Sequence, residues 1–157
     1  MATREELMGG LQFVPAQAKR VAVIIDGQND WEEKRTQGWS AKEMFTHVAV
    51  TAGMIPAMGA GMIAAPPEAE LTAGLDIASV NAAGVGSMAA MDTKQIVETL
   101  AGNYVKVSDW VKGLSDEQLA GKHTFLGMSL SASDLLMTLL VLHSVHHVYE
   151  AQLATPV

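Results

Sequence analysis

Three histidines stand close together near the C-terminus, at positions 143, 146 and 147. The residues around them follow a helical pattern, in which side chains four positions apart lie on one face, one turn above each other. His143 and His147 can therefore direct two imidazole rings toward one point. Two neutral imidazoles at this spacing chelate a divalent metal, as in helical H-x-x-x-H zinc sites. The pair indicates a metal site, although histidine pairs also occur as hydrogen-bonded structural groups.

His146 is the competing partner, because residues three positions apart also share a helix face. His147 is favoured because it lies closer to the line through Leu136 and His143. The polar neighbours of His123 favour a place for that side chain in a surface loop.

His47 is the histidine that we expect to complete the set. A lone histidine on an apolar helix face is more often a core residue with an internal hydrogen bond. A helix bundle can nevertheless place it opposite His143 and His147, as in metal sites in bundle cores. Three protein ligands with one open position are typical of catalytic rather than structural zinc.

Glu150 projects from the same helix face as the histidines and could orient a ligand imidazole or act as a base on a bound water. A solvated carboxylate near the helix end is the favoured interpretation. Four methionines are most simply soft core filling, and a deformable apolar pocket is the alternative: Met44, Met54, Met58 and Met62.

The composition restricts the class of protein. The chain of 157 residues fits a single domain, 1–157, and 49% hydrophobic residues suffice for a core. A net charge of -7 with scattered basic residues argues against nucleic-acid binding. Cysteine is absent, which excludes disulfides and thiol nucleophiles from the chain. Charged residues, glycine and proline interrupt every apolar stretch and the N-terminus is acidic, so we expect a cytoplasmic protein without a membrane span.

The elements that must position the histidines are helices. The clearest start is Ser40 with Glu43, a capping box, and similar signals occur at Asp92 and Ser131. Pro56 with nearby glycines is expected to close or kink the second helix. We predict an antiparallel four-helix bundle, an all-α fold, with short extra helices in its connections. The four long helices are expected to begin near Pro15, Ser40, Asp92 and Ser131, and a turn at 5–13 precedes the first of them. Short helices are expected at 76–88 and 114–119, and an extended segment at 124–126.

Several motifs together resemble the DinB/YfiT-like superfamily, in particular the branch of mycothiol-dependent maleylpyruvate isomerases. The segment that opens the second helix is similar to that family's W…T…GWS…H stretch, and Leu114–Glu117 is similar to its LSDE turn. The final helix resembles the pattern H-x-x-H-H-x-x-x-x-Q. The matching residues extend from about 31 to 153, nearly the whole domain: Trp31, Thr36, Gly38, Trp39, Ser40, His47, Asp76, Asn81, His143, His146, His147 and Gln152.

The resemblance implies a four-helix bundle with a three-ligand divalent metal site at His47, His143 and His147. Members with known roles are metal-dependent thiol transferases or isomerases that use mycothiol, bacillithiol or glutathione-like cofactors, and many are dimers. Some relatives have a glutamate where this chain has His143. Val148 stands where an arginine often follows, and the additional C-terminal domain of maleylpyruvate isomerases is not expected here.

The leading hypothesis is a metal-dependent enzyme of thiol-transferase or isomerase type acting on a small molecule. Zinc or nickel suits imidazole ligands and would activate a low-molecular-weight thiol, or equally a water for hydrolysis. The alternative is a non-enzymatic binding or stress-response module with a structural or vestigial metal site. A third possibility is a bundle that binds a hydrophobic ligand. We expect a homodimer, with Val141 and Val145 as exposed apolar candidates.

Overall fold

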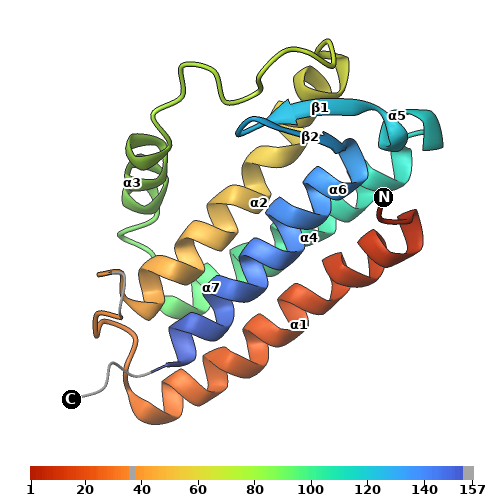
Figure 1. Cartoon of the computed structure of the whole chain (residues 1–157). Helices are drawn as coiled ribbons and strands as arrows, with labels where there is room; N and C mark the ends of the chain where they lie inside the picture. Colours follow the sequence, from red (N-terminus) through yellow and green to blue (C-terminus); the bar gives the residue numbers. More distant parts are fainter. Residues whose placement is uncertain (36–37, 154–157) are drawn as a thin grey trace.

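The computed structural model describes residues 1–35 and 38–153, so Thr36 lies outside the described residues. The chain is mostly helical, as expected. Figure 1 shows its long helical segments side by side, with the short elements at one end and along one flank. The long segments are α1 (Arg4–Gln28), α2 (Ala41–Ala64), α4 (Thr93–Gly113) and a C-terminal segment made of α6 (Ala132–Leu136), the π-helix η1 (Met137–Leu142) and α7 (His143–Gln152).

The long segments pack so that α2 contacts both α4 and α7, and α1 contacts the same two helices. The core between them is apolar, with fully buried side chains such as Leu11, Phe45, Leu100 and Leu136. The shorter elements are α3 (Ile77–Ser87), α5 (Asp116–Ala120) and the antiparallel strands β1 (Lys122–Phe125) and β2 (Met128–Ser131). The expected short helices are therefore present, and the extended piece is one strand of a hairpin.

Capping boxes begin several helices, as the sequence predicted for α2. The Ser40 hydroxyl accepts from the backbone N–H of Glu43, and the Glu43 carboxylate accepts from the backbone N–H of Ser40. These reciprocal bonds satisfy donors that the first helical turn leaves unpaired. At the last helix the box is incomplete, because Asp134 binds the Ser131 hydroxyl and the N–H of Ala2 instead.

The predicted start of the first helix at Pro15 is wrong. One continuous helix runs from Arg4 to Gln28, with a capping box at Thr3 and Pro15 inside it. Leu7 and Leu11, before the proline, are as deeply buried as the apolar residues after it. Burial of this continuous apolar face stabilises the helix enough to tolerate Gly9, Gly10 and the N–H that Pro15 lacks.

Pro56 does not close α2 either, since this helix continues to Ala64. Among the described residues, α2 is the one helix long and apolar enough to cross a membrane by length and composition. This is weak evidence for a span, because α2 is also the helix that contacts α3, α4 and α7.

The prediction that Val141 and Val145 are exposed is wrong. Val141 is buried, and its methyl groups would lie 2.7 Å and 2.9 Å from a β-carbon at Gly10. Glycine at this position lets α1 approach the C-terminal segment closely. Val145 is partly buried against the core. These two valines therefore do not form the apolar surface that a second subunit would need.

Candidate metal centre

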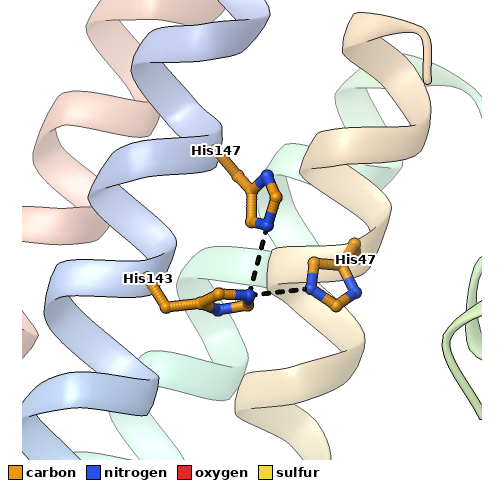
Figure 2. Close-up of side chains that lie close together, drawn as sticks. All are labelled: His47, His143 and His147. Atoms are coloured by element: carbon orange, nitrogen blue, oxygen red, sulfur yellow. Dashed lines mark hydrogen bonds between the residues drawn. The ribbon is translucent and has the colours of Figure 1, made fainter. Parts of the chain in front are cut away.

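The three predicted histidines meet in the interior, between α2 and α7. His47 lies in the second turn of α2, while His143 begins α7 and His147 follows one turn later. Figure 2 shows the three rings turned toward one another from the two helices. Packing of α2 against α7 is what brings the rings together. The sequence prediction of which histidines converge is confirmed.

The nitrogen atoms that face one another are all Nε2. Nε2 of His143 lies 3.2 Å from Nε2 of His47 and 3.2 Å from Nε2 of His147. One Nε2 carries either one proton or one lone pair, so it cannot form a full hydrogen bond in both contacts at once. Ligands at zinc–nitrogen distances of 2.0–2.1 Å on a tetrahedron lie about 3.3 Å apart. The spacing therefore fits a shared cation better than a hydrogen-bonded trio.

The protonation state also suits metal binding. Burial, with a smaller contribution from His143, lowers the pKa of His47 from 6.5 to about 4. Burial and the neighbouring imidazoles lower the pKa of His147 to about 3, and burial lowers that of His143 as well. The rings are therefore neutral at pH 7, and a neutral imidazole is the form that binds a metal.

The π-helix directly precedes His143 and changes how that residue is held. The backbone N–H of His143 bonds to the carbonyl of Thr138, five residues earlier, instead of the α-helical partner at Leu139. An interaction with the backbone of Leu139 raises the pKa of the His143 ring, in opposition to burial. Nδ1 of His143 is buried and makes no hydrogen bond within the described residues, so no partner there fixes the tautomer of this ring. Single π-helical turns are frequent at functional sites.

Trp39 packs over two of the three histidines. Its ring centroid lies 5.0 Å from that of His47 and 5.9 Å from that of His147, and the latter pair is stacked at 28°. The indole thus shields one side of the cluster from water. Exclusion of water strengthens electrostatic interactions within such a site.

Arg35 fixes the segment that carries Trp39, and sequence reasoning missed it. Its side chain is 1% exposed, pairs with Asp30 at 2.8 Å and donates to the carbonyl of Ala151 at the end of α7. The backbone N–H of Arg35 also donates to the carbonyl of Trp39. A buried arginine with this many partners ties the loop before α2 to the histidine-bearing helix.

Glu150 is not the solvated carboxylate that we favoured. Its side chain is 11% exposed, and Oε2 lies 3.4 Å from Nδ1 of His147. Carboxylates in this position orient ligand histidines and fix the tautomer that exposes Nε2. Neither Oε2 of Glu150 nor Nδ1 of His147 makes a hydrogen bond within the described residues, so the orienting role considered for Glu150 stays a prediction.

The two remaining histidines differ in exposure. The imidazole of His146 is 59% exposed and does not join the three converging rings, which agrees with the preference for His147. His123 was expected at the surface, but it is buried in β1 and burial lowers its pKa. The sequence pattern indicated only part of the hairpin to which β1 belongs.

A cavity of about 710 Å³ opens beside the histidine cluster. It lies between the start of α2 and α3, a helix with no buried residue. Trp39 and Thr46 line its wall toward the histidines, and Asn81 and Val85 line the opposite wall. Trp39 therefore separates a solvent-open cavity from the three Nε2 atoms. A second, apolar cavity of about 190 Å³ includes Met58 and Met62, two of the four methionines considered above.

Comparison of the chain with models of known protein families, with curated proteins and with solved structures found no match.

Proposed function

We propose that this protein is a metal-dependent enzyme of thiol-transferase or isomerase type, in which His47, His143 and His147 hold one divalent cation. The observation that carries the proposal is the convergence of three neutral, largely buried imidazoles whose Nε2 atoms have the spacing of a tetrahedral site. Three imidazoles favour zinc or nickel over calcium or magnesium, which prefer oxygen ligands. Such a cation would lower the pKa of a thiol or water molecule that binds beside it.

The residues of the chain then have distinct tasks. Glu150, whose Oε2 lies 3.4 Å from Nδ1 of His147, would hold that ring once a cation is bound, and the π-helix sets the backbone position of His143. Trp39 excludes water from the histidines on the side of the larger cavity. That cavity, with charged side chains at one end and apolar residues of α3 along its wall, suits a small amphipathic substrate. The chain has no cysteine, so a thiol nucleophile would have to come from a small molecule.

We propose in addition that the long helices form an antiparallel four-helix bundle of the DinB/YfiT-like kind, on the basis of the motifs around His47 and His143. The resemblance also suggests a homodimer, and the composition and acidic N-terminus favour a cytoplasmic location. Light scattering at micromolar concentration tests the dimer, and a monomeric mass would contradict it.

The apolar cavity around Met58 and Met62 favours a second candidate function, binding of a small hydrophobic ligand. Thermal shift with apolar compounds, with and without a chelator, separates the two. A shift that survives the chelator in a His143→Ala variant would support ligand binding without metal.

The experiment for the main proposal has two readouts. Co²⁺ added to the metal-free protein should give the visible spectrum of a tetrahedral centre, and glutathione-like thiols should then change that spectrum. A thiol that leaves the spectrum of the cobalt-loaded protein unchanged would contradict the thiol reaction but not the metal site.

A further inference from the structure

The second ring nitrogen of His147 faces a different set of donor atoms. Nδ1 of His147 lies 3.4 Å from Oε2 of Glu150, and Nε2 of His146 lies 3.4 Å from the same oxygen. One donor atom from each of these three residues lies within 4.8 Å of the other two. His147 thus belongs to two groups of potential metal ligands, one on each side of its ring.

We propose that His146, Glu150 and Nδ1 of His147 bind a second divalent cation, so that the ring of His147 is shared by two cations. The proposal rests on the proposed function for the first cation, held through Nε2 by His47, His143 and His147. It adds a site outside the three histidines and gives the exposed His146 a role.

Two buried atoms at this second position lack hydrogen-bond partners. Oε2 of Glu150 and Nδ1 of His147 are both inaccessible to solvent, and neither makes a hydrogen bond within the described residues. A buried carboxylate oxygen without a partner is costly, and it calls for a proton donor or a cation nearby. Their separation of 3.4 Å matches the ligand–ligand spacing of about 3.3 Å on a tetrahedral zinc site.

The ligand chemistry fits a transition metal of the same class. Two imidazole nitrogens and one carboxylate oxygen suit zinc, copper or nickel. When only the first cation is bound, Nδ1 of His147 keeps its proton, which lies between this ring and Glu150. Binding of a second cation displaces this proton to the solvent, and the ring becomes an imidazolate that coordinates through both nitrogens.

The two sites should differ in affinity. The first is enclosed by Trp39 and the buried rings of His47 and His147. The second includes the His146 ring, which is 59% exposed, and its binding requires the loss of a proton. The second cation should therefore bind more weakly and exchange with solvent more readily.

Copper titration followed by electron paramagnetic resonance tests the shared ring. With Cu²⁺ alone as the probe, the signal of the wild-type chain should grow through the first equivalent. It should then fall as the second equivalent binds, because an imidazolate bridge couples the two spins. A signal that keeps growing in proportion to bound copper would overturn the shared ring.

Two variants separate the sites. His146→Ala removes an exposed side chain, so the fold should persist; this variant should bind one equivalent with an uncoupled signal. His47→Ala should weaken the first site and also abolish the coupling. If wild-type and His146→Ala chains both bind one equivalent, the second site is refuted while the first stands. If the wild-type chain binds none, the proposed function fails as well.

Discussion

Nε2 of His47 lies 3.2 Å from Nε2 of His143, although 96 positions separate the two residues in the chain. The contact depends on the packing of α2 against α7, and a π-helical turn directly precedes His143. His147 approaches the same Nε2 atom from one turn further along α7. A metal at this point would cross-link two helices that meet only in the folded state, and would stabilise that state accordingly.

Glu150→Gln should weaken binding of the first cation by about 10–100-fold, because a carboxamide orients His147 less strongly than a carboxylate does. Zinc affinity measured by competition with a chelating dye, at less than one equivalent of metal, reports this site alone. Glu98→Gln, on the exposed surface of α4, is the matched control and should bind as the wild type does. Equal affinity in the two variants would remove the orienting role.

Trp39 should report occupancy of the cluster, since its ring lies 5.0 Å from His47 and is stacked on His147. Paramagnetic Ni²⁺ or Cu²⁺ should quench part of the tryptophan fluorescence of the wild type. Trp39→Phe should lose that quenching and still bind the metal. Unchanged quenching in this variant would mean that the metal binds elsewhere.

Arg35→Ala should lower the free energy of unfolding by about 3–5 kcal/mol, because it leaves the largely buried Asp30 carboxylate without its charge partner. Urea denaturation of the metal-free protein measures the loss. Lys112→Ala removes an ion pair with Asp109 in which both side chains are more than 60% exposed, and should cost less than about 1 kcal/mol. Similar losses in both variants would show that Arg35 does not anchor its segment.

Acid should destabilise the metal-free protein through its buried histidines. The pKa of His47 falls from 6.5 to about 4 on folding, so the unfolded chain takes up protons first as the pH drops. The contribution of the neutral His47 ring to the free energy of unfolding is fully present above pH 6.5. It is lost as the pH falls from about 6.5 to about 4. His147, with a pKa of about 3, extends the loss to lower pH.

Urea midpoints measured from pH 7.5 to pH 4 in the presence of a chelator check this dependence. His47→Asn should flatten the curve relative to the wild type. A midpoint that stays constant over this range would contradict neutral burial of these rings.

Local signals in the sequence predicted much of the architecture and the placement of His143 and His147 on one helix face. Ser40 with Glu43 located the start of α2, and Asp92 located that of α4, because capping residues act within a single turn. The spacing of His143 and His147 placed both rings on one face for the same local reason. These features depend on neighbours a few positions apart.

Features that depend on distant contacts were not predictable in this way. Helix α1 continues through Gly10 and Pro15 because its buried face packs against the other long helices. The burial of Glu150 depends on how α7 packs, and that of His123 on the hairpin. The one-residue shift of the π-helix leaves no distinct pattern in the sequence, yet it sets the backbone hydrogen bond of His143 to Thr138.

The most direct test of the three-histidine site is the metal content of protein purified without a histidine tag, loaded with Zn²⁺ or Ni²⁺ and dialysed exhaustively. The wild-type chain should retain one tightly bound cation, His143→Ala should retain none, and His146→Ala should retain one. A wild-type chain without metal, or a His143→Ala variant that holds as much as the wild type, would contradict a cation shared by His47, His143 and His147.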